Sequence, residues 1–310
     1  METRQPNILQ MMRAPFLTSI LSPLFLGTLL AVSVSGQINW IGFILLLVMG
    51  IGLHSATNVY NDIYDTKQGT DRVNRHRNPF SGGSGIIINF PHLESNMFWL
   101  ARISLIIALL ATAGLMFVVD RSLWPHLWSL YLLSAFFSKY YTAAPLKLAY
   151  RGWGEISVWF AFGPMAILVA AVSQNVGWHP LIISAMPLTG ISTLSILLLG
   201  QLIDRDADHQ GGKWGVAVRQ GTAFCARLYL VVQILLVFNL VYLAFFSAPN
   251  GWPLILGALP YALLLPRAGK IVLTYHDQAD QLKSAAGINV QLHLLFALLI
   301  NTGAAIRLFL

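Results

Sequence analysis

Nine long apolar runs dominate the sequence, and each is long enough to cross a lipid bilayer. A spanning helix needs roughly 20 mostly apolar residues. The chain is 56% hydrophobic and only 10% charged, whereas soluble domains carry about 25% charged residues. We therefore expect one all-α domain over residues 1–310, a polytopic membrane helical bundle of about nine transmembrane helices. The expected spans cover about residues 15–35, 40–60, 97–119, 124–143, 153–173, 181–203, 223–247, 251–268 and 287–308.

The basic residues indicate how such a bundle is oriented. The net charge is +7, but the positive residues lie in short segments between apolar runs and form no basic, aromatic-interleaved patch, which argues against a nucleic-acid partner. Of the 19 Lys and Arg residues, all but Arg121 and Arg307 fall on the same side as the N-terminus. The positive-inside rule then predicts a cytoplasmic N-terminus and an external C-terminus.

The first acidic motif closes the second apolar run. If that helix continues to Asp65, then Asn58, Asn61, Asp62 and Asp65 recur at spacings of three and four and share one helical face. Neighbouring carboxylates at the end of an apolar helix repel each other and lose hydration, so cations are needed to stabilise them. Oxygen ligands of this kind suit Mg²⁺, which bridges to substrate phosphates.

The second acidic motif closes the sixth run. Asp204 and Asp208 are four residues apart and share a face, while Asp206 points elsewhere. Either motif alone could be a solvated helix end. Two of them on the cytoplasmic side of an apolar protein instead predict a metal-assisted site for a diphosphate that carries a lipid tail.

Basic side chains near these motifs are candidates to bind the diphosphate, because its oxygens need cationic donors as well as metal. The alternative is that each of them only follows the positive-inside rule. The predicted diphosphate-binding residues are Arg72, Arg75, Arg77, Lys139, Lys147, Arg151, Lys213 and Tyr141.

Other polar features are interpreted as structural. His54 and His293 fall within apolar runs, and we expect each to be a hydrogen-bonded core histidine. Glu155 lies one turn after Arg151, which we expect to be its ionic partner. The glycine-rich stretch at residues 82–85 follows no predicted strand and is interpreted as an inner loop rather than a nucleotide site.

These motifs together resemble the UbiA superfamily of intramembrane prenyltransferases. The first motif of that family is matched by Asn61, Asp62, Asp65 and Asp71. The spacing of Asp71, and the run from Tyr141 to Glu155, are similar to the branch that contains 1,4-dihydroxy-2-naphthoate prenyltransferases. The second motif of that branch is matched by Asp204, Asp208, Gly212, Lys213, Ala217, Val218, Arg219 and Gly221. The chain departs from the branch at Gln201, Ile203, Trp214, Gly215 and the loop at residues 77–83.

The resemblance implies a central cavity that opens laterally to lipid and a Mg²⁺-dependent transfer from an isoprenyl diphosphate donor to a small aromatic acceptor. It further implies menaquinone-type quinone biosynthesis in a bacterial or archaeal inner membrane, with the active site facing the cytoplasm. Asp62, Asp65, Asp204 and Asp208 would be catalytic. The implied metal ligands are Asn58, Asn61, Asp62, Asp65, Asp71, Asp204 and Asp208.

Several alternatives remain at the level of sequence. The acceptor could instead be a quinolone, homogentisate, 4-hydroxybenzoate or a glycerol phosphate ether. A transporter is a non-enzymatic alternative, but it predicts charges near the bilayer midplane rather than at one face. A phospholipid head-group transferase also uses acidic metal sites, but neither motif here has its Asp-Gly pattern followed by Ala-Arg.

Overall fold

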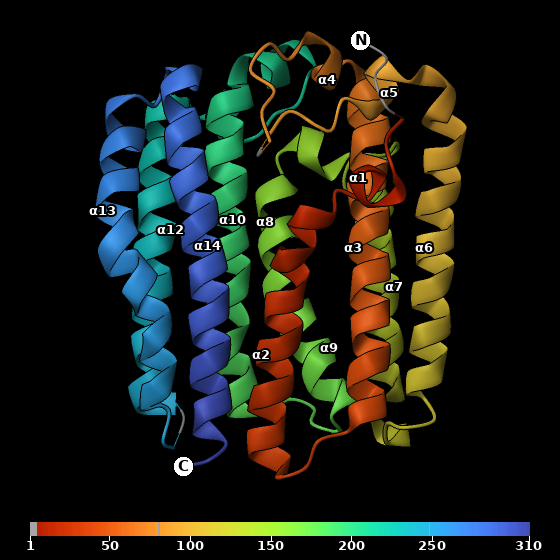
Figure 1. Cartoon of the computed structure of the whole chain (residues 1–310), viewed down its shortest axis with the longest axis vertical. Helices are drawn as coiled ribbons and strands as arrows, with labels where there is room; N and C mark the ends of the chain where they lie inside the picture. The colour runs from red at the N-terminus through yellow and green to blue at the C-terminus, as the bar shows by residue number, and fades with distance from the viewer. Residues whose placement is uncertain (1–4, 80, 248) are drawn as a thin grey trace.

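The computed structural model describes residues 5–79, 81–247 and 249–310, and these form a helical bundle without β-strands (Figure 1). The all-α prediction is confirmed. The long helices are α2 (Thr18–Ser35), α3 (Trp40–Gln68), α6 (Glu94–Leu115), α7 (Trp124–Tyr140), α10 (Pro180–Gln210), α12 (Thr222–Tyr242), α13 (Leu259–Thr274) and α14 (Ala279–Arg307). One further span is interrupted and consists of α8 (Gly154–Phe160), the π-helical turn η5 (Ala161–Met165) and α9 (Ala166–Ser173).

Eight of the helical segments in the described chain are long and apolar enough to cross a membrane. The shorter α7 has 17 residues and runs beside α3 and α6 (Figure 1). The chain is thus an integral membrane protein, and the prediction of about nine membrane helices is confirmed.

Several helices extend beyond the predicted spans, and three of them do so by seven or more residues. The apolar runs predict helix ends at about residues 60 and 203, but α3 continues to Gln68 and α10 to Gln210. At the other end of the chain, α14 begins at Ala279 rather than at about residue 287. The reason is the same in each case: the extra turns carry polar residues, so they are helical without being apolar.

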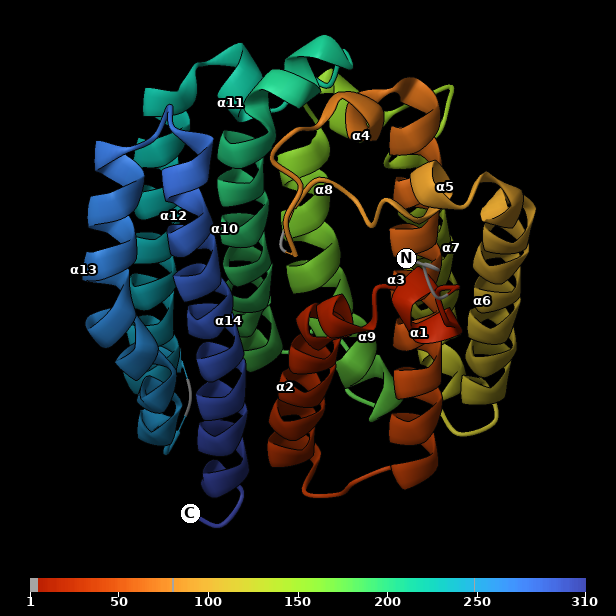
Figure 2. The ribbon, with the colours of Figure 1, turned by 45° about the horizontal axis from the view of Figure 1, so that its top comes forward.

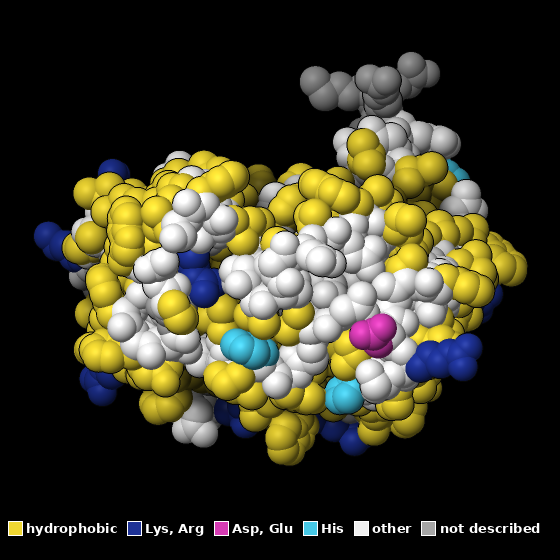
Figure 3. All heavy atoms as spheres, turned by 90° about the horizontal axis from the view of Figure 1, so that it is seen from below, with side chains coloured by type: hydrophobic (Ala, Val, Ile, Leu, Met, Phe, Trp, Pro, Cys, Tyr) yellow, Lys and Arg dark blue, Asp and Glu magenta, His cyan; other side chains and the backbone are white. Residues whose placement is uncertain are grey.

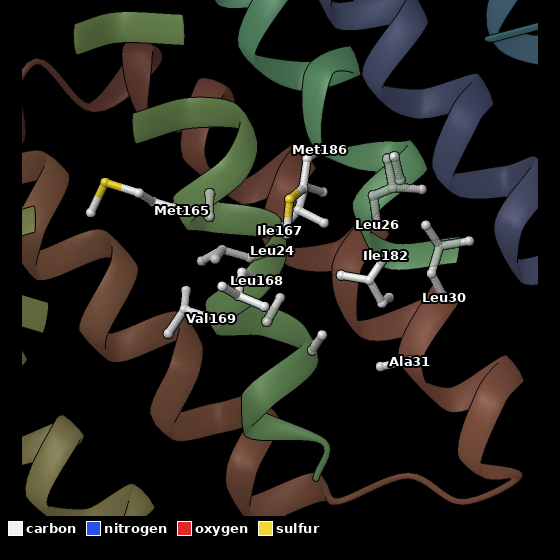
Figure 4. Packing of buried hydrophobic residues seen from close by; sticks show 14 of the residues in the cluster. Leu24, Leu26, Leu30, Ala31, Met165, Ile167, Leu168, Val169, Ile182 and Met186 are labelled. Carbon is white, nitrogen blue, oxygen red and sulfur yellow. The ribbon is translucent and has the colours of Figure 1, made fainter. Parts of the chain in front are cut away.

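The helices pack most tightly where glycines remove side chains from the contact. A Cβ on Gly163 of η5 would collide with the carbonyl oxygen of Met186, and a Cβ on Gly190 of α10 would collide with that of Trp159. The backbones of η5 and α10 therefore touch. Around this contact an apolar core fills the middle of the bundle, and Figure 4 shows Leu24 of α2 among its residues.

The two ends of the bundle differ. One end carries the long connections with the short helices α4 (Thr70–Val73), α5 (Ile86–Asn89) and α11 (Val216–Arg219) (Figure 2). The short helix α1 (Ile8–Met11) lies beside α3 below this end (Figure 1), and the turn η4 (Leu148–Arg151) precedes α8. The opposite end has shorter turns, and the face seen from below in Figure 3 is largely apolar or uncharged, with few acidic side chains. The remaining short turns are η1 (Ala14–Leu17), η2 (Pro91–Leu93), η3 (Arg121–Leu123), η6 (Leu243–Ser247) and η7 (Trp252–Ala258).

Candidate active site

The C-terminal turns of α3 and α10 lie at the same end of the bundle and bring the two acidic motifs to one polar cavity of about 210 Å³. Both motifs are helical, as their residue spacing predicts. Because α3 and α10 continue beyond their apolar parts, their acidic residues lie beyond the apolar core. Of the predicted ligands and basic residues, those lining this cavity are Asn58, Asn61, Asp65, Asp71, Asp204, Asp208 and Lys213.

Lys213 connects the two motifs. Its Nζ lies 2.9 Å from Asp65 Oδ2 on α3 and 4.0 Å from Asp208 Oδ1 on α10. Burial by itself would lower the pKa of Lys213, but the Asp65 and Asp208 carboxylates outweigh it and hold that pKa well above its ordinary value. Asp65 also accepts hydrogen bonds from Tyr150 OH at 2.7 Å and from Asn61 Nδ2 at 3.1 Å. Asp65 thus connects α3 to Lys213 and to Tyr150 of the η4 turn.

Arg13 is a site residue that the sequence analysis did not single out. Its Nη1 lies 3.7 Å from Asp62 Oδ1, and its guanidinium lies over the ring of Phe16, 4.4 Å from the centroid. Arg13 adopts a left-handed backbone conformation with φ +53°. Arg13 lines the polar cavity. In the sequence it is one of many basic residues on the cytoplasmic side, and nothing there distinguishes it from the others.

The loop between α4 and α5 also enters the site. Asn74 Nδ2 and Ser81 Oγ donate to Asp204 Oδ1 at 2.8 and 3.2 Å, and Ser84 N donates to Asp62 Oδ1 at 3.0 Å. The predicted glycine-rich inner loop therefore lies against both acidic motifs. The sequence carried no signal for this, because Asn and Ser in a glycine-rich loop are ordinary.

Two carboxylates of the site each have one buried oxygen without a hydrogen-bond partner in the described chain, an arrangement that suits a cation-binding site. Burial, followed by the neighbouring charges of Asp65 and Asp62, raises the pKa of Asp71 to about 8. Asp62 Oδ2 and Asp71 Oδ2 are buried without a hydrogen-bond partner, an arrangement that costs free energy unless a ligand satisfies them. Asp71 lies directly against Gly83, where a Cβ would collide with its carboxylate.

The described residues contain no group of three or more His, Cys, Asp or Glu side chains close enough to hold a metal by themselves. The two acidic motifs instead face each other around Lys213. Mg²⁺ commonly binds through one or two carboxylates and completes its shell with waters and substrate phosphates. The donor set fits that mode of binding rather than an all-protein cage.

The other predicted basic residues do not line the polar cavity. Arg72, Arg75, Lys139 and Arg151 are exposed; Arg72 Nε donates to the Thr66 carbonyl. Their contact with a diphosphate stays a prediction. Two more are partly buried. Arg77 donates to the Gly82 and Asp71 carbonyls at 2.8 and 2.6 Å, and Lys147 Nζ lies 5.9 Å from the Tyr150 ring centroid.

The expected pair of Glu155 and Arg151 is wrong. Glu155 Oε1 accepts hydrogen bonds from Gln201 Nε2 at 2.9 Å and from Val216 N at 2.7 Å. Its ionic partner is Arg219, 3.8 Å away, while Arg151 is exposed. Arg151 belongs to the η4 turn rather than to α8, so the helical spacing assumed for the pair does not exist.

A second, apolar cavity of about 100 Å³ adjoins the polar one. Its wall is formed by side chains such as Leu24, Leu46 and Met49. The two cavities share their lining at His54, Thr57, Tyr141, Val158 and Phe162. The site thus has a charged end beside the loops and an apolar end within the bundle, which suits a ligand with a charged head and a hydrocarbon tail.

Residues 20–295 match the model of the UbiA prenyltransferase family. The chain belongs to this family. It is accordingly an enzyme, a prenyltransferase, and the transporter and head-group transferase alternatives fall away. The resemblance drawn from the motifs is confirmed.

Curated UbiA relatives cover most of the chain. A 2-carboxy-1,4-naphthoquinone phytyltransferase from Synechocystis sp. is 29% identical over 292 residues, which are 94% of this chain and 90% of the relative. A 1,4-dihydroxy-2-naphthoate octaprenyltransferase from Mycobacterium leprae is 28% identical over 250 residues, 80% of each chain. These names support the menaquinone-pathway branch of the family.

Solved UbiA structures share the fold. A UbiA homologue from Aeropyrum pernix superposes with a TM-score of 0.62 at 12% identity, covering 94% of this chain and 98% of the other. A UbiA homologue from Archaeoglobus fulgidus bound to DMAPP and Mg²⁺ gives a TM-score of 0.58 at 13% identity, covering 96% and 99%. At these identities the likeness establishes the helical membrane bundle.

Proposed function

We propose that this UbiA-family enzyme transfers a prenyl group from an isoprenoid diphosphate to a small aromatic acceptor, in a Mg²⁺-dependent step of menaquinone-type quinone biosynthesis. The observation that carries the proposal is the joined pair of cavities. Acids from α3 and α10 line the charged one, and apolar side chains line the other. A prenyl diphosphate has this same division between head and tail.

The metal ligands would come from both acidic motifs, namely Asn58, Asn61, Asp62, Asp65, Asp71, Asp204 and Asp208. The unpartnered oxygens of Asp62 and Asp71 support this assignment. When bound, Mg²⁺ neutralises the diphosphate and makes it a better leaving group.

The side chains of the chain itself supply the remaining functions. Lys213 and Arg13 line the charged cavity and bind diphosphate oxygens as charge-assisted donors. Departure of the diphosphate leaves an allylic cation at the junction of the cavities, where the faces of Tyr141 and Phe162 stabilise positive charge. The apolar wall excludes the water that would otherwise quench the cation. An electron-rich ring carbon of the acceptor then forms the new bond and releases its own substituent, a proton or, from a carboxylated carbon, carbon dioxide, which restores the aromatic ring.

The naphthoquinone and naphthoate relatives favour a bicyclic aromatic acid as the acceptor. The basic residues of the connections favour an inner-membrane location with the N-terminus and active site in the cytoplasm and the C-terminus outside. Cysteine labelling from each side of sealed vesicles would test this orientation.

A magnesium-dependent assay in nanodiscs tests the activity. Radiolabelled prenyl diphosphates of several lengths are supplied with a panel of aromatic acceptors, and Asp62→Ala and Asp204→Ala are assayed in parallel. We expect a lipid-soluble product that requires Mg²⁺ and is lost in both variants.

Asp206→Ala is the matched control, because Asp206 belongs to the second motif by sequence but is exposed and pairs with Arg205 at 3.0 Å. This variant should keep its activity. A product formed without any divalent cation, or retained in both active-site variants, would contradict the assignment of the acids.

A further inference from the structure

His54 is a buried polar residue to which the proposed mechanism gives no role. It lies on α3, two turns before Asp62, so roughly 12 Å deeper along the helix axis. Its side chain lines both cavities at their junction, and only 7% of its surface is exposed. Its ring stands edge-on to that of Phe162, with centroids 5.0 Å apart.

The ring nitrogen Nδ1 of His54 is buried without a hydrogen-bond partner among the described residues. The side chain of Asn58, one turn further along α3, contacts the His54 ring, and its amide nitrogen donates to the Met12 carbonyl. The expectation of a hydrogen-bonded core histidine is therefore met only by the contact with Asn58, and Nδ1 itself has no hydrogen-bond partner in the part of the chain that the structure describes. A buried polar atom of this kind calls for a ligand or a water.

His293, the other buried histidine, shows how a histidine with a purely structural role is hydrogen-bonded. Both ring nitrogens of His293 have hydroxyl neighbours, Ser192 Oγ at 2.8 Å and Ser19 Oγ at 3.4 Å. The prediction of a hydrogen-bonded core histidine is confirmed there. Because His54 has an unpartnered ring nitrogen and His293 does not, His54 is the buried histidine that can hydrogen-bond a bound molecule.

The position of His54 narrows the identity of that molecule. The diphosphate head belongs with the acids about two turns away, and a prenyl tail has no polar atom that could bond an imidazole. An aromatic acceptor has two features that suit the junction. It has a flat ring, which can pack against the side chains of Phe162 and Tyr141, and it has oxygen substituents, which can bond the His54 nitrogen.

We propose that His54 is a specificity-determining contact for the acceptor, with its Nδ1 hydrogen-bonded to an oxygen substituent on the aromatic ring. This inference rests on the proposed function. A neutral imidazole nitrogen can donate to a carboxylate or accept from a hydroxyl, so either oxygen substituent satisfies it. The contact would orient the ring beside the first carbon of the prenyl group.

The test compares His54→Leu with His54→Asn in nanodiscs, measuring KM separately for the acceptor and for the prenyl diphosphate. Loss of a buried hydrogen bond should raise the acceptor KM of His54→Leu about 5- to 150-fold. The KM for prenyl diphosphate should stay as in wild type. His54→Asn should recover much of the loss, because its amide can bond the same oxygen.

An acceptor analogue that lacks the oxygen substituent provides a second readout. Wild type should discriminate against it by a similar factor, and His54→Leu should not. This comparison keeps the inference testable if His54→Leu folds poorly, since wild type and His54→Asn suffice to measure it.

His293→Leu is the matched control, because it removes a buried histidine that lines neither cavity. It should leave the acceptor KM unchanged. An unchanged acceptor KM in His54→Leu, or an equal rise in both KM values, would overturn the role of His54 while leaving the activity intact. A wild-type protein that makes no prenylated product would instead refute the proposed function itself.

Discussion

Replacing Lys213 by Met should destabilise the metal-free protein strongly. With an effective dielectric constant of about 20, the attraction of Lys213 is about 6 kcal/mol to Asp65 at 2.9 Å and about 4 kcal/mol to Asp208 at 4.0 Å. Burying the ammonium offsets several kcal/mol of this gain. Removing one partner of a buried pair costs about 3–5 kcal/mol net, because it leaves the other charge uncompensated.

The loss should be partly reversible by Mg²⁺. In the wild type, the Lys213 ammonium lies near both Asp65 and Asp208 and neutralises their charges, which a metal cation would otherwise do. In Lys213→Met these acids are free, so added Mg²⁺ should raise the free energy of unfolding by more than it does in wild type. The same variant should bind prenyl diphosphate more weakly, because an ammonium donor is lost.

The measurement is unfolding in mixed micelles with increasing SDS, followed by tryptophan fluorescence with EDTA or with Mg²⁺. Lys283→Met is the control, because Lys283 makes a comparably short contact to Asp280, 2.8 Å, but both side chains are exposed. The control should show no measurable change. Equal stability of Lys213→Met and wild type in EDTA would refute the assignment of Lys213 as the cation that joins the motifs.

Three further predictions follow from the site. Gly83→Ala places a Cβ against the Asp71 carboxylate and should lower activity about 100-fold by displacing it. Gly212→Ala has a similar positive φ but open space around it, so a prenyl-transfer assay should show the smaller effect in that variant. Tyr150→Phe leaves the buried Asp65 without a 2.7 Å donor and should cost about 1–3 kcal/mol of unfolding free energy, measured as above. The raised pKa of Asp71, about 8, means that the folded metal-free protein holds a proton that the unfolded chain releases above pH ~4. Its stability in EDTA should therefore fall as the pH rises from about 4 to 8 and level off above, and Asp71→Asn should remove that slope.

The membrane spans could be predicted because each consists of a long apolar run, and bilayer thickness fixes the length of helix required. Helix bounds could not be predicted where polar residues continue a helix past its apolar part. The last two turns of α3 and α10 are the clearest examples, and they are the turns that carry the acids.

The site could be predicted in part for a related reason. Carboxylates at helical spacing can be recognised along the sequence, so Asp65 and Asp208 can be predicted as site residues. Contacts between distant segments are not visible in that way. Arg13 approaches Asp62 across 49 positions, and Glu155 pairs with Arg219 rather than with the basic residue nearest in sequence. His54 was identified as a buried histidine, but only the fold shows which of its atoms lacks a partner.

The touching backbones of η5 and α10 at Gly163 and Gly190 fix how closely these two segments approach each other beside the cavities. Direct main-chain contact leaves no room for a side chain between them, so their spacing depends on both glycines. Residues of η5 line the apolar cavity, and residues of α10 line the polar one. A side chain at either glycine would push the two segments apart and would therefore change the shape of the active site itself.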